Sequence, residues 1–321
     1  VPDGRRIILH ARRLQSGRTF SKAADRVLIA TGHWFEQSDR KNYFTSPWPA
    51  CELLRSIPAG EHVGVIGTSL SAIETVLTLT SDGRFNYDES GELCFRPSPD
   101  TRKMALYSRR GMLPKVRGRT GSYRNQHLTW ENLNQLNPAG SERLTLAQII
   151  QWLNSDLESA YGRAFNWEAV VNPSGSPADL LRESLNQAQT GDGPHGELIW
   201  QTVLHQSFPL ARELFLRLAP AERERFEREF ATLFFVHAAT QPVINAEKTL
   251  ALLKSGIVTV NKLGEDYRFF KDKTRDLFVF SYRDASGKPR RDRFRYVINA
   301  RGQEKSLKTN PSALAQNLLQ S

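Results

Sequence analysis

The stretch of the chain that most constrains its fold is a strand-like run that turns directly into a helix. It reads HVGVIGTSLSAIETVLTLT and extends from His62 to Thr80. The apolar run VGVIG is typical of a strand buried on both faces, and the apolar residues after the turn recur at helical spacing. Such a strand–turn–helix is the first part of the phosphate-binding βαβ unit of doubly wound proteins. The sequence therefore predicts an α/β fold with a Rossmann-like nucleotide-binding domain.

The turn departs at one position from the dinucleotide-binding pattern G-x-G-x-x-G/A. In that pattern the glycines make a tight turn, let the backbone approach the pyrophosphate and keep the helix close to the strand. Here Gly67 takes the first place, Ser69 the second and Ala72 the third. The helix N-terminus still offers backbone N–H groups and a positive dipole end to an anion. Ser69 could contact the ligand or could only cap the helix. The residues expected to hold a pyrophosphate are Gly67, Thr68, Ser69, Leu70 and Ser71.

A pair of arginines follows the next predicted strand, residues 103–108. An acidic residue at this place binds the ribose 2′-hydroxyl of NAD, whereas arginine accommodates the 2′-phosphate of NADP. This chain has Ser108, Arg109 and Arg110 there and no carboxylate. The planar fork of a guanidinium matches a phosphate group. The sequence therefore predicts NADP as the nucleotide. The turn-rich residues 82–100 are expected to form an excursion that lengthens the spacing from Gly67.

Around this unit the sequence predicts further strands and one long helical block. Strands are expected at 5–14 and 25–30, and a three-stranded β-meander at 267–272, 277–284 and 291–300. Residues 141–240 show apolar side chains at helical spacing, for example Phe226 and Phe230, with no strand-turn-glycine signal. We interpret this block as a large α-helical insertion, not a second nucleotide fold, that lies beside the nicotinamide cleft and shapes access to it. The alternative is a helical cap that only covers the sheet.

The amino-acid composition indicates the class of protein to which the chain belongs. Of the 321 residues, 39% are hydrophobic and 24% are charged, which is a globular composition. No apolar run reaches about eighteen residues, so no membrane span is expected. The two cysteines are too few for a disulfide framework, which fits a reducing compartment and predicts a cytoplasmic location. The seven histidines lack metal-ligand spacing, so no metal site is expected, and no catalytic residue is identified.

The net charge of +10 is concentrated in one stretch. Residues 101–124 contain eight lysines and arginines and no acidic residue. Such a run fits a phosphate-bearing ligand, a nucleic acid or merely a solvated face. Because the run begins within the predicted nucleotide-binding unit, the phosphate-bearing ligand is favoured and nucleic acid is the less favoured partner.

Four segments, in this order, resemble a family of flavoproteins with two dinucleotide-binding domains. They are VLIATGHW, VGVIGTSLSAIET, LYSRRGMLP and YVINARGQ, and the resemblance covers roughly residues 1–140 and 240–321. The family includes relatives of flavin-containing monooxygenases and amine N-hydroxylases, and bacterial FAD-NAD(P)-binding proteins. The resemblance implies that Thr31, Gly32 and His33 form a turn near the flavin, and that Gly302 belongs to a second turn leading back. Arg301 replaces the family's threonine, and Ser69 replaces its glycine.

The resemblance also implies a domain organisation. Residues 1–48 would belong to the FAD-binding domain, 49–140 and 241–305 to the NAD(P)-binding domain, 141–240 to the helical insertion, and 306–321 to a segment returning toward the FAD domain. The FAD phosphate turn would lie before Val1 and a closing segment after Ser321. We therefore expect an internal fragment that is colourless when purified alone, with FAD bound only in the full-length protein.

These patterns predict an NADPH-dependent flavoprotein oxidoreductase, conceivably a monooxygenase, in which this chain supplies the NAD(P)-binding half. Two other classes stay open. A non-enzymatic module could keep the nucleotide fold and bind a partner through the helical insertion, which retained nucleotide binding without hydride transfer would favour. A nucleic-acid-binding protein would be retained on DNA or RNA in a salt-dependent way that NADPH does not displace. The sequence predicts neither the substrate nor the oligomeric state.

Overall fold

The computed structural model describes residues 6–28, 38–136, 144–302, 310 and 312–320. The chain divides into two compact units, one made of residues 1–36 and 303–321 and the other of residues 37–302. Each unit is described by itself. The domain boundaries expected from the sequence remain predictions.

The first unit contains a β-hairpin and a C-terminal helix. Strands β1 (Ile7–Arg12) and β2 (Thr19–Ala24) pair antiparallel, and α11 (Ala313–Gln320) is the helix. The strand predicted at 25–30 is wrong over its described part, because residues 25–28 form no strand and Leu28 is 92% exposed. The pairing ends at Ala24, opposite Ile7, so residues 25–28 of the apolar run that follows have no partner strand.

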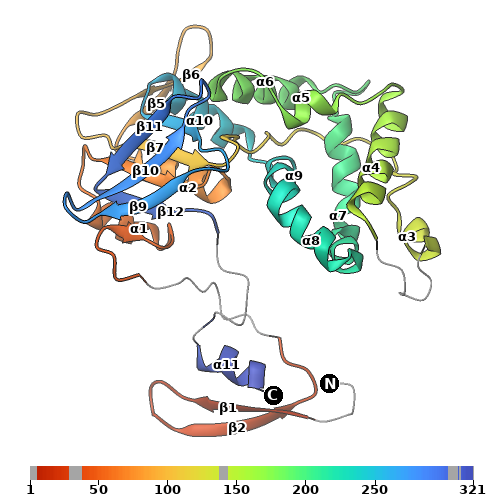
Figure 1. Cartoon of the computed structure of the whole chain (residues 1–321), viewed down its shortest axis with the longest axis horizontal. Helices are drawn as coiled ribbons and strands as arrows, with labels where there is room; N and C mark the ends of the chain where they lie inside the picture. Colours follow the sequence, from red (N-terminus) through yellow and green to blue (C-terminus); the bar gives the residue numbers. More distant parts are fainter. Residues whose placement is uncertain (1–5, 29–37, 137–143, 303–309, 311, 321) are drawn as a thin grey trace. The chain divides into compact units, whose positions relative to one another are not determined.

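The second unit is built on a five-stranded parallel sheet. Its strands are β3 (Tyr43–Phe44), β4 (His62–Ile66), β7 (Lys103–Ser108), β8 (Val258–Lys262) and β12 (Tyr296–Asn299). They lie in the order β3-β12-β4-β7-β8. Figure 1 labels β7 and β12 of this sheet. The strands that follow β4 in the chain, β7 and then β8, lie on one side of β4, and β12 lies on its other side. The predicted α/β fold with a parallel sheet is confirmed, and the short strand β3 was not predicted.

Different layers cover the two faces of this sheet. Helices α1 (Ala50–Ser56), α2 (Leu70–Leu79) and α10 (Val243–Lys254) pack on one face. An antiparallel meander of β9 (Arg268–Asp272), β10 (Leu277–Arg283) and β11 (Pro289–Phe294) packs on the other. Side chains of a strand alternate between the faces. Accordingly Val63 and Val65 join the core under the helices, whereas Ile66 joins the core under the meander.

The meander has the three strands that the sequence predicts, but its third run is not one strand. Residues 291–300 are interrupted at Arg295, where β11 ends and β12 begins in the parallel sheet. Phe294 packs in the aromatic core under the meander, whereas Tyr296 packs on the helical side. The chain therefore changes layers within two residues. The meander also approaches β4 closely, since a Cβ atom on Gly64 would lie 3.0 Å from the ring of Phe294.

The excursion predicted at 82–100 is an antiparallel hairpin of β5 (Arg84–Tyr87) and β6 (Leu93–Arg96). Lys248 of α10 lies over the ring of Phe85, 5.6 Å from its centroid, and Phe95 packs in the core under the helices. The hairpin therefore extends the helical layer and leaves the pairing of β4 with β7 intact.

A helical segment, defined here as residues 130–238, connects β7 to α10. Its helices are α3 (Trp130–Leu136), α4 (Leu146–Tyr161), α5 (Trp167–Val171), α6 (Pro177–Thr190), α7 (Ile199–Arg217), α8 (Pro220–Arg225), the π-helix η1 (Phe226–Phe230) and α9 (Ala231–Ala238). In the part of the chain that the structure describes, none of the helices is both long enough and apolar enough to cross a membrane.

The helical segment has an inner and a distal part. In the inner part, Leu181 and Leu185 of α6 pack against Ala246 and Leu250 of α10, which itself covers the sheet. The distal part has a core of its own. The buried residues of this distal core are Leu128, Leu133, Leu144, Leu146, Leu210, Leu214 and Leu218, with Phe226 and Phe230 of η1 against it. Pro209 lies inside α7, directly before Leu210, the first α7 residue of the distal core. Proline at such a position interrupts the hydrogen-bond ladder and favours a bend.

His237 in α9 gives the fold a pH dependence. Its ring lies 5.4 Å from that of Trp200, and its Nδ1 is 2.9 Å from the carbonyl oxygen of Leu233. Burial lowers the pKa of His237 to about 4, although the contact with Leu233 opposes the shift. In the unfolded chain the His237 imidazole binds a proton below about pH 6.5, whereas in the folded chain it binds one only below about pH 4. Stability present above pH 6.5 should therefore fall by roughly 3 kcal/mol as the pH drops toward 4.

Urea denaturation at pH 7.5 and pH 4.5 measures this dependence. His237→Gln should lose less stability between the two pH values than the wild-type chain does. His195→Gln, at an exposed histidine, is the matched control and should keep the wild-type dependence. An identical pH dependence in wild type and His237→Gln would contradict the assignment.

Candidate nucleotide-binding site

Three segments meet where parallel strands end at one edge of the sheet. Gly67 follows β4, Ser108 ends β7 and Ala300 follows β12. The Gly67 amide donates to the Tyr107 carbonyl (2.7 Å), and the Ala300 amide donates to the carbonyl of Ile66 (2.8 Å). The strand order reverses at β4, and in open α/β sheets ligands bind beyond the carboxyl ends at such a reversal. This edge is therefore the candidate site.

Gly67 makes the turn from β4 into α2. Its φ is +121°, and a Cβ atom there would lie 3.0 Å from the carbonyl oxygen of Ala300. Gly67→Ala combines backbone strain with this contact, so we expect it to lower the free energy of unfolding by about 1–3 kcal/mol. Gly60→Ala is the control, because Gly60 also has a positive φ (+74°) but open space around its Cβ position. Equal losses in urea denaturation would show that the approach of Ala300 is unimportant.

Thr68 and Ser108 join the turn to the end of β7. The Thr68 hydroxyl is 2.6 Å from the Met112 carbonyl, to which it donates, and 3.0 Å from the hydroxyl of Ser108. Ser108 also accepts from the Gly111 amide (3.0 Å). Thr68 is only 6% exposed. These two residues therefore position the site from inside, with their hydroxyls turned toward each other.

The N-terminus of α2 has open hydrogen-bond donors. Ser69 is the N-cap residue and is exposed, but its side chain makes no cap hydrogen bond to the described residues. Its carbonyl accepts from Ala72 (2.9 Å) and Ile73 (3.1 Å). The amides of Leu70 and Ser71 have no acceptor in the described chain. The capping role considered for Ser69 is thus not seen here. Open donors at a helix N-terminus favour an anion.

Arg109 and Arg110 lie at the predicted place, directly after β7, but both contact the helical segment. Arg109 donates to the Arg228 carbonyl and to the Thr232 hydroxyl (both 3.1 Å), and its Nη1 is 3.8 Å from Glu265 Oε2. Arg110 donates to the Glu229 carbonyl (3.1 Å) and to the carbonyl of Val171 (3.5 Å). The sequence carries no signal of these contacts, because most of the acceptors are backbone carbonyls of distant residues.

Other members of the basic stretch also have structural partners. Arg102 is buried and donates twice to the Ile57 carbonyl (2.8 and 3.1 Å), and Arg117 contacts Thr240. Burial lowers the pKa of Lys115, while nearby Glu183 opposes that shift. Arg119 and Arg124 are exposed. The basic residues of 101–124 are therefore distributed over several environments and do not form a single open face.

The turn after β12 adds a cation that the sequence analysis did not assign to the site. Arg301 is exposed, and Asn299 Oδ1 accepts from its backbone amide (3.3 Å) and its Nε (3.1 Å). Gly302 has a φ of +92° with open space around it. The position of Arg301 directly after a strand of the parallel sheet was the available signal. The residues Thr31, Gly32 and His33 lie outside the described residues.

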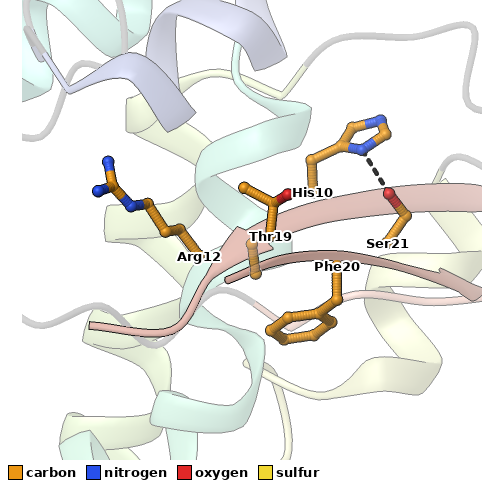
Figure 2. A pocket seen from close by; sticks show the side chains of 6 residues that line it. His10, Arg12, Thr19, Phe20 and Ser21 are labelled. Atoms are coloured by element: carbon orange, nitrogen blue, oxygen red, sulfur yellow. Dashed lines mark hydrogen bonds between the residues drawn. The ribbon is translucent and has the colours of Figure 1, made fainter. Parts of the chain in front are cut away.

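Two surface hollows are lined by residues that do not belong to this edge. One is on the hairpin of the first unit, where His10 Nδ1 and the Ser21 hydroxyl are 2.7 Å apart and Arg12 and Phe20 flank them (Figure 2). It is lined by a single hairpin and lacks the polar groups from several elements that ligand sites bring together. The other is on the outer face of the meander, between Phe270 and Arg291. Among the described residues, no cluster of histidine, cysteine and acidic side chains could hold a metal ion.

Comparisons with known proteins give relatives of about twice this length. No family model matches the chain. An uncharacterised protein of Escherichia coli strain K12, YdhS, is 27% identical over 304 residues, which are 88% of this chain and 55% of that protein. Two solved structures are 13% identical: ornithine hydroxylase PvdA of Pseudomonas aeruginosa (TM-score 0.41, 94% of this chain and 51% of that one) and FAD-bound DfoA, a cadaverine monooxygenase of Erwinia amylovora (0.38, 98% and 52%). The chain thus spans about half the length of the proteins that it matches.

Proposed function

We propose that this chain is the NAD(P)-binding half of an NADPH-dependent flavoprotein oxidoreductase. The observation that carries the proposal is the N-terminus of α2. There the amides of Leu70 and Ser71 and the hydroxyl of Ser69 are open, beside the reversal of strand order. A helix N-terminus at this place in an α/β sheet favours a phosphate anion.

The groups at the sheet edge fit the parts of a dinucleotide. The backbone from Gly67 to Ser71 would hold the pyrophosphate, with Thr68 and Ser108 fixing the turn from inside. The adenosine end would lie toward β7, where Arg109 and Arg110 are suited to a 2′-phosphate. The nicotinamide end would then lie toward β12, next to Arg301 and Gly302. NADPH would supply a hydride, and the residues of this chain would bind and orient it.

The flavin part of the proposal rests on the four sequence segments that resemble two-domain flavoproteins. By that resemblance FAD would be held by a longer protein, and the segments with Thr31, Gly32 and His33 and with Gly302 would connect the two nucleotide domains. A monooxygenase is one form of such an enzyme.

We also propose that the helical segment shapes access to the nucleotide. It connects β7 to α10, so it starts from the same edge of the sheet as the candidate site. Connections at that edge can lengthen without disturbing the core. The contacts of Arg109 and Arg110 with η1 and Thr232 place part of the segment beside the arginines that would bind the nucleotide.

Calorimetric titration of the chain with NADP⁺ and NAD⁺ tests the proposal. We expect saturable binding of both, with NADP⁺ bound more tightly. Ser69→Gly restores the glycine of the pattern and should preserve or strengthen the binding of both nucleotides, while Ser90→Gly, in the exposed β5–β6 turn, is the matched control. The longer protein should show a flavin absorbance that NADPH bleaches without oxygen. If neither nucleotide binds, the proposed function is wrong.

A further inference from the structure

We infer that Arg109 and Arg110 form a latch between the nucleotide site and the helical segment, and that the 2′-phosphate of NADP(H) opens it. This inference rests on the proposed function. It adds specificity-determining residues, namely Thr232 and the η1 turn, whose groups compete with the nucleotide for the two guanidinium groups. NAD(H), which lacks the 2′-phosphate, would leave the latch closed.

Contacts with the helical segment already hold both terminal nitrogens of each arginine. Arg109 uses both terminal nitrogens, on the Arg228 carbonyl and the Thr232 hydroxyl, and Arg110 uses both of its own, on Val171 and Glu229. A phosphate that binds a guanidinium bidentately needs two neighbouring N–H groups of that same fork. A guanidinium has five N–H groups, so these contacts leave the Nε–H and one N–H on each terminal nitrogen. A 2′-phosphate that binds end-on across the two terminal nitrogens would compete with the helical segment for the same side of the fork.

The acceptors that hold the arginines are weaker than the proposed ligand. Apart from Glu265, which is 75% exposed and 3.8 Å away from Arg109, they are neutral carbonyls and one hydroxyl. Hydrogen bonds between a guanidinium and an ionised phosphate are roughly twice as strong as those between neutral groups. The 2′-phosphate can therefore displace the η1 turn, whereas the ribose hydroxyl of NAD has no comparable advantage.

The η1 turn, which the arginines release when the latch opens, is suited to movement. The Ala231 amide bonds to the carbonyl of Phe226, five residues earlier, so η1 is a π-turn within the run from α8 to α9. π-turns are rare and occur frequently at functional sites. The side chains of Arg228 and Glu229 are 65% and 41% exposed, so water can reach this turn when the arginines leave.

The η1 turn is also connected to the rest of the distal part. Phe226 and Phe230 pack against the distal core, so displacement of η1 would move α7 and α8 with it. Pro209 within α7 offers a place for the bend, since the hydrogen-bond ladder is interrupted there. The inner part would stay in place, because Val116 and α6 pack against α10.

Thermodynamic linkage predicts in which direction the affinity for the phosphate changes when one contact of the latch is removed. If the closed contacts withhold the arginines from the phosphate, removing one contact raises the affinity for the phosphate. Thr232→Val deletes the hydroxyl that binds Arg109 and keeps the shape of the side chain. It should tighten binding of 2′-AMP, a probe that carries the 2′-phosphate, by about three- to tenfold. Thr232→Ser keeps a hydroxyl and should behave like the wild type.

Titration calorimetry on the whole chain, with 2′-AMP and 5′-AMP as probes, tests this. Glu265→Gln, at the exposed carboxylate beside Arg109, is a second variant expected to tighten 2′-AMP binding. Thr274→Val, at an exposed threonine in the β9–β10 turn, is the matched control. Binding of 5′-AMP should be the same in all of them. Saturation with 2′-AMP should also speed amide hydrogen exchange in residues 226–232.

The outcomes separate the two proposals. If wild-type chain binds 2′-AMP but Thr232→Val and Glu265→Gln bind it no more tightly, the latch is wrong and the proposed nucleotide site stands. Protection of residues 226–232 on binding, instead of faster exchange, overturns the latch in the same way. If the wild type and both variants bind no 2′-AMP at all, the latch and the assignment of the arginines fall together.

Discussion

Replacing Arg109 and Arg110 together by alanine should abolish the preference of the chain for NADP⁺ over NAD⁺. A hydrogen bond to a charged group is worth about 1.5–3 kcal/mol, so losing both guanidinium groups should weaken NADP⁺ binding on the order of a hundredfold or more. NAD⁺ lacks the 2′-phosphate, so its dissociation constant should change little. Titration calorimetry with both nucleotides measures the two effects in the same preparation.

The control for this variant comes from the same basic stretch. Arg119 and Arg124 are exposed, and Arg119→Ala with Arg124→Ala removes the same total charge from the region. That pair should leave the NADP⁺ preference intact. Because Arg109 and Arg110 also hold η1 and Thr232, the double variant should be checked by thermal unfolding. Equal weakening of NADP⁺ and NAD⁺ would show that the arginines do not recognise the 2′-phosphate.

The sheet around β4 could be predicted from the sequence because its signals are local. An apolar run, a glycine at the turn and a helical apolar face all lie within His62–Thr80. The structure adds the reason for Gly67, which is the approach of Ala300 from β12. That contact joins residues far apart in the chain, so no local pattern could have given it.

The errors of the sequence analysis come from cases where tertiary pairing decides. The run at 25–30 has the composition of a strand, yet its described part has no partner because the β1–β2 pairing ends at Ala24. The run at 291–300 is continuously strand-like, yet at Arg295 it leaves the meander for the parallel sheet. Strand propensity depends on burial and on neighbouring strands, which a single run does not reveal.

In the candidate site, too, the sequence predicted the types and positions of residues but not their hydrogen-bond partners. The positions of Ser69 and Arg109 at the carboxyl ends of strands followed from the order of elements. Their neighbours did not: the acceptors of Arg109 are a carbonyl in η1 and the hydroxyl of Thr232. A backbone carbonyl exists at every residue, so a sequence gives no sign of which one a guanidinium will find.

Asp156 is a second residue whose role the sequence hides, and its replacement should have a large effect on stability. It lies in α4 and is fully buried. Its carboxylate accepts from the amides of Gln126 (2.7 Å), His127 (3.0 Å) and Leu128 (2.8 Å), which lead into the distal core. Asp156→Ala leaves these amides without an acceptor. Since a buried unpaired donor costs about 1–3 kcal/mol, we expect the free energy of unfolding to fall by about 3–5 kcal/mol.

Urea denaturation followed by circular dichroism measures that loss. Asp82→Ala is the matched control, because Asp82 is exposed and the described part of the chain offers its carboxylate no partner. Asp156→Asn keeps one acceptor oxygen but turns an NH₂ group toward the amides, so its stability should fall between the other two. The loss should be greatest around the distal core, so hydrogen exchange of residues 126–128, which lead into it, should quicken before that of β4. Stability of Asp156→Ala equal to that of Asp82→Ala would mean that water replaces the carboxylate without cost, which its complete burial argues against.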